Sequence, residues 1–216
     1  MTVKARLPSD APYEQRARSQ PVRDDRLADL GRAASAGDEA ALEQLLRSIA
    51  PDILRVVRAV LGSSNTDVED LVQDCLLGFM RALGQFRYES SVSTFALTIA
   101  FRHALAAKRR QRDLVRWIDT FQRLHQPLLP VPPSPAQDLE FERRRAIVAE
   151  LLTTIPKPQA EALGLRTVVG LSIEQIARAT DVPANTVRSR LRLAKEALRR
   201  SIEADPDLRE FLEPPA

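Results

Sequence analysis

Residues 171–200 constrain the fold most, because they hold two helical patterns separated by a very short turn. The first pattern places aliphatic residues on one face at spacings of three and four, namely Ile173, Ile176 and Ala177. Ser172 precedes it and is a residue type that caps helix starts. Residues 180–182 form the turn, and Pro183 suits the first position of the next helix, where its missing N–H has no partner in any case. The pattern predicts a helix-turn-helix.

The second of these helices carries two stripes on nearly opposite sides. The apolar stripe consists of Val187, Leu191, Ala194 and Leu198. The cationic stripe consists of Arg188, Arg192, Lys195 and Arg199. Asn185, Thr186 and Ser189, near the N-terminal end, are residue types that contact bases or phosphates in a major groove. These features favour DNA binding, and the alternative is an ordinary solvated basic face.

Composition restricts the rest of the chain. Its 216 residues suffice for one large domain or two small ones, and seven glycines without an alternating β-branched pattern indicate an all-α protein. With 32 basic and 29 acidic residues the net charge is only +3, so nucleic-acid affinity must come from local patches. Cys75 is alone, and His103 and His125 lie in no ligand pattern, so no disulfide, metal or cofactor is expected. No signal peptide or membrane span is recognised, which predicts a cytoplasmic protein.

The chain divides into five segments. We expect a disordered extension at 1–25, a helical domain at 26–112, a Pro-rich linker at 113–137, a second helical domain at 138–204 and a tail at 205–216. The prediction is therefore an all-α fold of two small helical domains on one tether.

Helix boundaries within the first domain are also predicted. A helix starts at Arg26 and breaks at residues 37–38, where Asp38 caps a second helix that Pro51 kinks and Gly62 ends. Further helices follow at about 67–84 and 93–112.

The helix from about residue 67 presents an acidic face. Residues 66–69 predict a capping box. The buried face is expected to contain Val68, Leu71, Val72, Cys75, Leu76 and Phe79. The exposed face is expected to contain Asp67, Glu69, Asp70, Gln73 and Asp74. The helix macrodipole alone explains acids in the first turn, but Asp74 lies beyond it, so a protein-binding acidic face remains an equal alternative.

Residues 86–112 lead from an aromatic loop into a helix that ends in a basic cluster. Phe86 and Tyr88 beside cations are suited to stacking on single-stranded nucleic acid. The structural alternative places Phe95, Ile99 and Phe101 in the core and lets the cations stabilise the helix C-terminus.

Together, these features resemble a known family. Asp-x-Glu-Asp-Leu-x-Gln at 67–73, the aromatic loop and basic helix, the linker, and Thr-Val-Arg-Ser-Arg-Leu at 186–191 resemble the bacterial sigma-70 family, most closely its two-domain extracytoplasmic-function (ECF) group. The resemblance covers about 26–112 and 138–203, and no additional middle domain is indicated.

The resemblance implies three sets of binding residues. Those for core RNA polymerase, its beta and beta-prime subunits, are Asp67, Glu69, Asp70, Leu71, Gln73 and, from the acidic face, Asp74. Those for the promoter −10 element are Phe86, Arg87, Tyr88, Ser90, Thr94, Arg102, Lys108 and Arg109. Those for the −35 element are Asn185, Thr186, Arg188, Ser189, Arg190, Arg192 and Lys195. Arg102 stands where many members have an Asn, and Leu193 and Lys195 stand where arginines are frequent, so the family's promoter sequences do not carry over.

The implied function is a sigma factor that binds core polymerase, selects promoters and helps to melt them, with no catalytic residues, small-molecule substrate or metal of its own. The alternative is a stand-alone helix-turn-helix repressor or activator. The resemblance also implies an anti-sigma factor, which would hold the protein at the inner membrane face. The linker residues available for such docking are Trp117, Ile118, Phe121 and Leu124, which would otherwise pack on this protein's own domains.

Overall fold

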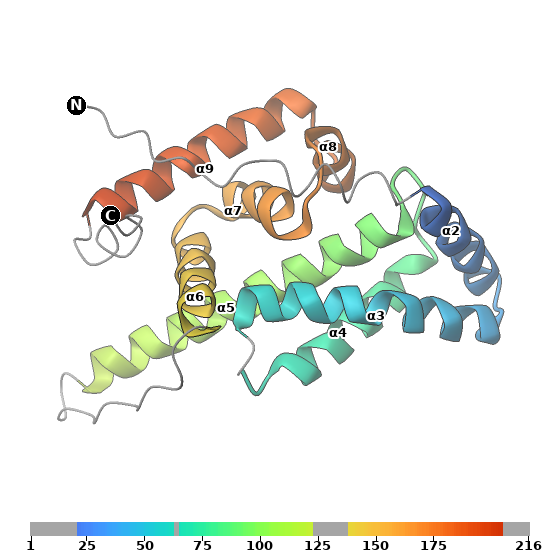
Figure 1. Cartoon of the computed structure of the whole chain (residues 1–216), viewed down its shortest axis with the longest axis horizontal. Coiled ribbons are helices and arrows are strands. Elements are labelled where there is room, and N and C mark those ends of the chain that lie inside the picture. Colours follow the sequence, from blue (N-terminus) through green and yellow to red (C-terminus); the bar gives the residue numbers. More distant parts are fainter. Residues whose placement is uncertain (1–20, 63–64, 123–137, 205–216) are drawn as a thin grey trace.

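The computed structural model describes residues 21–62, 65–122 and 138–204, and within these ranges the chain is helical and contains no strand (Figure 1). The N-terminal bundle consists of α2 (Pro21–Ser35), α3 (Glu39–Leu61), α4 (Val68–Leu83) and α5 (Val92–Gln122). The C-terminal bundle consists of α6 (Asp138–Thr154), α7 (Lys157–Gly164), the π-turn η1 (Leu165–Val169), α8 (Ile173–Thr180) and α9 (Ala184–Ala204). The all-α prediction is confirmed. None of the described helices is long and apolar enough to cross a membrane.

The boundaries of α3 follow from its end residues. The Asp38 Oδ1 atom accepts a hydrogen bond from the Ala41 amide at 2.9 Å, as predicted for the N-cap. Gly62 ends the helix with a φ of 96°, a conformation that favours glycine. Pro51 lies inside a helix that continues on both sides of it. The inward stripe includes Leu45, Ile49, Ile53, Val56, Val57 and Val60, all buried.

Helix α4 buries its predicted face, but its start differs from the prediction. Val68, Leu71, Cys75 and Phe79 are buried, and Val72 and Leu76 pack partly against them. The predicted capping box is wrong, because the helix starts one residue later with Asp67 as the N-cap and without a side-chain cap bond. The side chain of Asn65 accepts from the Asp67 amide at 2.9 Å instead.

Two helices extend beyond their predicted bounds. Helix α5 continues to Gln122 instead of ending at residue 112, because no proline or glycine interrupts the sequence between Val92 and Pro127. Helix α2 begins at Pro21 rather than Arg26, with a residue suited to the first helical position. The remaining parts of the predicted extension and linker, and the tail at 205–216, lie outside the described residues.

The helix-turn-helix of the C-terminal bundle forms largely as predicted. Ser172 and Gln175 make a reciprocal capping box at the start of α8. Asp181 ends α8 in the left-handed conformation with a φ of 51°. Pro183 precedes α9 rather than occupying its first turn, since its carbonyl accepts from the Val187 amide at 3.2 Å. Val187 and Ala194 are fully buried, and Leu191 and Leu198 pack at the edge of the core.

The two bundles pack on each other. Figure 1 shows α6 and α7 lying against the long helix α5. One continuous apolar cluster runs through both bundles and includes Phe101, Ala104 and Leu105 of α5 together with Leu152, Ile155, Leu163 and Leu165. Because this cluster joins residues far apart in sequence, the two bundles share one core in the free chain, and we call this arrangement the closed chain.

Candidate nucleic-acid and protein interfaces

The acidic face of α4 is exposed as predicted. Asp67, Glu69, Asp70, Gln73 and Asp74 are all exposed. Leu71 is different, since it is only 7% exposed and anchors the helix in the core. A carboxylate row of this kind is complementary to a basic protein surface.

Two apolar side chains continue this face, and the sequence reasoning did not select them. Leu77 is 47% exposed and lies three residues after Asp74, and Met80 is 37% exposed and lies three residues after Leu77. In the sequence, this extension is indicated by Leu77, an apolar residue one turn beyond Asp74 that lies outside the buried stripe. Behind the face, burial and then the nearby Asp74 raise the pKa of the Cys75 thiol to about 12, so this thiol stays protonated at neutral pH.

The aromatic residues of the predicted −10 loop are packed into the fold. Phe86 stacks on Phe95 with ring centroids 4.3 Å apart, and Tyr88 lies 4.7 Å from Phe86. The guanidinium of Arg32 lies 5.1 Å from the Tyr88 ring centroid. Tyr88 has a φ of 57°, and its hydroxyl is buried without a hydrogen-bond partner. Phe86 and Tyr88 are therefore half-buried, rather than free stacking surfaces.

The polar residues of the same loop and of the first turn of α5 divide into exposed and buried members. Arg87 is exposed and Ser90 is half-buried. Thr94 is only 5% exposed, and its amide donates to the Ser91 Oγ atom at 3.1 Å, which caps the start of α5. Thr94 thus serves the helix start and is not available for direct contact with DNA in this fold.

Arg102 and Arg109 of α5 contact the C-terminal bundle. Arg102 pairs with Glu161 and also donates to the carbonyl of Ala179 at 3.4 Å. Arg109 donates through Nη2 to the carbonyls of Ile155 at 2.8 Å and Leu152 at 3.4 Å. Desolvation, with a further contribution from Arg112, lowers the pKa of the Arg109 guanidinium from its ordinary value.

The basic face of α9 is exposed. Arg188, Arg192, Lys195 and Arg199 lie on the surface with Asn185 and Ser189, while Thr186 and Arg190 are half-buried. Arg188 donates to the Asn185 Oδ1 atom at 2.8 Å and lies 3.9 Å from a Glu174 carboxylate oxygen. Arg192 pairs with Glu196 at 2.7 Å. These residues form a surface that is suited to a DNA groove.

Glu174 connects the two helices of the motif electrostatically. Its own backbone N–H and then the Ser172 hydroxyl, with the charges of Arg188 and Arg166, lower the pKa of this carboxyl below its ordinary value. The carboxylate is therefore ionised at neutral pH, and its oxygen lies 3.9 Å from the Arg188 guanidinium of α9.

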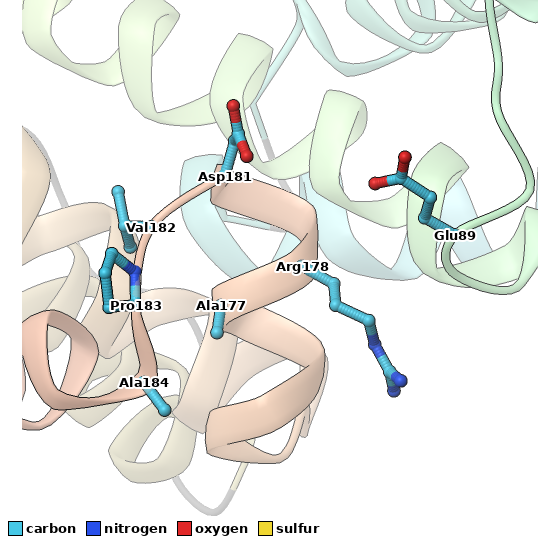
Figure 2. A pocket seen from close by; sticks show the side chains of 7 residues that line it. All are labelled: Glu89, Ala177, Arg178, Asp181, Val182, Pro183 and Ala184. Atoms are coloured by element: carbon cyan, nitrogen blue, oxygen red, sulfur yellow. The ribbon is translucent and has the colours of Figure 1, made fainter.

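A groove separates the helix-turn-helix from the loop that precedes α5. Figure 2 shows Glu89 on the loop across from Arg178 of α8 and from the turn formed by Asp181 and Val182. The open space has a volume of about 480 Å³. The predicted −10 loop and the helix-turn-helix therefore lie side by side in the closed chain.

Comparison with known proteins identifies the two bundles. The family described as Sigma-70 region 2 matches residues 45–113, and the family described as Sigma-70, region 4 matches residues 145–198. The RNA polymerase sigma-H factor of Pseudomonas aeruginosa is 30% identical over 181 residues, which cover 81% of this chain and 91% of that protein. The chain belongs to the sigma-70 family.

The sigma factor falls in the ECF group. It is 30% identical over 172 residues to the ECF RNA polymerase sigma-E factor of Escherichia coli K12, covering 77% of this chain and 89% of that one. Its fold resembles that of CnrH, solved in complex with the cytosolic domain of CnrY, with a TM-score of 0.53, 22% identity, and coverage of 84% of this chain and 99% of that chain. A sigma factor directs RNA polymerase to promoters and is not itself an enzyme.

The matched regions of the sigma factor contain the predicted surfaces. Region 2 includes the acidic face of α4, the aromatic loop and the basic part of α5, and region 4 includes the helix-turn-helix. Helix α2 precedes the region 2 match, and through Arg32 it contributes to the packing of Tyr88.

Proposed function

We propose that this sigma factor docks on core RNA polymerase through the acidic face of α4. The residues of this face are Asp67, Glu69, Asp70, Gln73 and Asp74, extended by Leu77 and Met80. Carboxylates around two exposed apolar side chains provide both charge complementarity and burial of apolar area, the two contributions that protein interfaces combine. This exposed face is the observation that carries the proposal, since helix capping does not account for Asp74 or for Met80.

The two DNA elements are assigned to separate bundles. The −35 element meets α9, where Arg188, Ser189 and Arg192 face the bases with Asn185 beside them, and Thr186, Arg190 and Lys195 lie nearer the phosphates. The −10 element meets Arg87 and Ser90 of the loop and Arg102, Lys108 and Arg109 of α5, while Phe86 and Tyr88 shape the loop. Promoter melting would follow from holding the separated strand there.

In the cytoplasm, an anti-sigma factor would hold this sigma factor inactive. That partner would compete with core polymerase for the acidic face or separate the two bundles. If that partner is anchored to the inner membrane, it keeps the sigma factor at the membrane surface.

Reconstitution with core polymerase tests the function. The purified chain, mixed with core polymerase and a library of promoter fragments, should yield a stable complex and specific transcripts with a shared −35 and −10 pair. A palindromic site bound tightly without polymerase, with no transcription upon its addition, would instead indicate a stand-alone repressor or activator.

A further inference from the structure

Tyr88 connects the loop between α4 and α5 to helix α2. The centroids of the Tyr88 and Phe86 rings are 4.7 Å apart, and the Arg32 guanidinium of α2 lies 5.1 Å from the Tyr88 centroid. The Asp29 carboxylate pairs with Arg32 at 3.0 Å on the same helix, which helps to direct the guanidinium. Phe86 in turn stacks on Phe95 of α5. The Tyr88 ring therefore receives contacts from α2 directly and from α5 through Phe86.

Gly31 of α2 provides the space for the Tyr88 hydroxyl. Gly31 is buried, and a Cβ atom added to it would lie 3.2 Å from the Tyr88 Oη atom and 3.4 Å from the Val92 Cγ2 atom. A glycine inside a helix destabilises that helix relative to alanine, so α2 gains nothing from Gly31 by itself. Because an alanine methyl group would press on the hydroxyl, glycine is the residue that lets the Tyr88 ring approach α2 this closely.

The packed conformation of Tyr88 is destabilised in two ways. Its φ of 57° lies in the left-handed region, where a residue with a side chain is strained. Its buried hydroxyl has no hydrogen-bond partner among the described residues, and an unpaired buried donor destabilises the state that buries it. Such a conformation persists only where surrounding contacts outweigh the strain. Here these contacts come from Gly31, Arg32 and Phe86, which we call the Tyr88 seat.

The Tyr88 seat holds the middle of the loop, while helices hold its two ends. At the start of the loop, the Phe86 amide donates to the carbonyl of the last α4 residue at 3.1 Å. At its end, the Ser91 hydroxyl accepts from an amide in the first turn of α5 at 3.1 Å. Arg87 and Ser90 lie between these ends, one on each side of Tyr88 along the chain. Since a left-handed residue turns the backbone, the conformation of Tyr88 determines the direction of both neighbours.

We propose that Tyr88 is a positioning residue for −10 recognition: its ring, held in the Tyr88 seat, sets the path of residues 87–90 and so directs Arg87 and Ser90 toward the promoter strand. Helix α2, which precedes the region 2 match, thereby contributes to −10 specificity without contacting DNA itself. The inference rests on the proposed function, which assigns this loop to the −10 element. It adds the residues that hold the loop in the conformation that contacts DNA.

Substitution Gly31→Ala tests the Tyr88 seat from the α2 side and leaves every residue of the loop unchanged. The added methyl group presses on the Tyr88 hydroxyl, while alanine suits the helical backbone of α2. The holoenzyme is titrated with single-stranded oligonucleotides that carry each of the four bases in turn at every −10 position. We expect Gly31→Ala to reduce the ratio between the best and worst −10 affinities at least about fivefold, the lower end of typical coupling between sites.

The matched control adds Tyr88→Phe to Gly31→Ala. It removes the hydroxyl that the methyl group meets, and the Tyr88 Cε1 atom lies at an ordinary contact distance of 3.7 Å from the added Cβ position. The double variant should therefore recover the −10 discrimination that Gly31→Ala loses. If it keeps the defect, displacement of Tyr88 is not the cause, and the positioning role is wrong. Unchanged discrimination in Gly31→Ala overturns the inference as well, and so does a gain in affinity, which would mean that the freed ring stacks on a base.

Two further affinities separate positioning from a general loss of structure. Binding to core polymerase and to a −35 duplex should stay at the wild-type level in Gly31→Ala, since the proposed surfaces for both lie outside the loop. Where Gly31→Ala lowers all three affinities or does not fold, Tyr88→Gly decides. Glycine adopts the left-handed conformation without strain, and loss of the ring frees the middle of the loop, so −10 discrimination should fall selectively. Retained discrimination in Tyr88→Gly overturns the inference.

Arg87→Ala distinguishes failure of the inference from failure of the proposed function. If Arg87→Ala weakens binding to the −10 oligonucleotides while Gly31→Ala and Tyr88→Gly bind as the wild type does, only the positioning role of Tyr88 is wrong. If Arg87→Ala also has no effect, the assignment of this loop to the −10 element is wrong, and the inference fails with it.

Discussion

Arg188 has partners inside the chain that fix its direction before DNA arrives. Asn185 accepts from it on the same helix, and the Glu174 carboxylate approaches it from α8. A preoriented guanidinium loses less conformational entropy when it meets a guanine edge than a free one does. Lys195, about two turns further along the exposed face, lies at a position suited to a phosphate.

Arg188→Ala should weaken binding to the cognate −35 sequence by about 1–3 kcal/mol and relax the preference at one base position. Lys195→Ala should weaken binding to all sequences alike and reduce the salt dependence, since a phosphate contact carries no sequence information. Binding of both variants to a −35 library, measured at two salt concentrations, separates these effects. If both lose affinity evenly across the library, Arg188 does not read a base.

Glu174 should make thermal stability depend on pH. Its pKa in the folded protein is lowered below the ordinary value of 4.5, so its stabilising contribution is complete above that value and is lost as the pH falls through the lowered pKa. The difference in thermal midpoint between wild type and Glu174→Gln should therefore be present at about pH 6 and should shrink as the pH falls through the lowered pKa. A difference that grows on acidification would contradict this assignment.

Among the elements, α4 has a core face and an acidic face on opposite sides. Its inner face supplies Cys75 and Phe79 to the core, while the outer face holds the acidic residues. Because Asp70 and Asp74 are exposed, changing their charge should alter the binding of core polymerase and leave the packing of the hydrophobic core intact.

Asp70→Lys with Asp74→Lys should weaken core-polymerase binding by several kcal/mol, because attraction to a basic surface becomes repulsion. The matched control is Glu39→Lys with Glu43→Lys on α3, which has the same charge change and spacing on another exposed face. Titration of labelled sigma factor with core polymerase measures both affinities. Equal affinities in the two folded variants would return the α4 acids to a purely structural role.

Elements whose signals are local could be predicted from the sequence. The caps of α3 and α8 depend on Asp38, Ser172 and Gln175, which lie within a few residues of the amides or carbonyls they bind. The predicted start of α4 is wrong because Asn65, and not Thr66, accepts the hydrogen bond from a backbone amide at the helix start. The side-chain amide of Asn65 also donates to the Gln111 side chain of α5 at 3.4 Å. That second contact depends on tertiary structure.

The candidate site follows the same division between local and distant signals. Periodicity alone located the exposed faces of α4 and α9. It did not show that Thr94 is buried, or that Arg102 and Arg109 meet residues of the C-terminal bundle, because these contacts join distant parts of the chain. The sequence around Gly164 also does not predict that the Phe101 ring packs against this glycine. A glycine inside a helical pattern shows only that space is needed, and not which side chain fills it.

At the scale of the whole molecule, the linker determines how the two bundles act together. Figure 1 shows α4 and α9 on opposite sides of α5, so this helix lies between the two helices that carry the proposed polymerase and −35 surfaces. The Pro-rich residues 123–137 join the bundles, and on a promoter they set the effective concentration of one bundle for its DNA element once the other is bound.

Inserting ten Gly and Ser residues after Pro133 should therefore weaken holoenzyme binding to a promoter with both elements by only about twofold, since effective concentration falls with roughly the −3/2 power of tether length. Binding to a promoter that lacks the −35 element should not change, because only one bundle then contacts DNA specifically. The control carries the same insertion ahead of Pro21, which adds length without separating the bundles. A loss of tenfold or more, measured by equilibrium binding of the holoenzyme, would mean that the linker makes specific contacts of its own and is not only a tether.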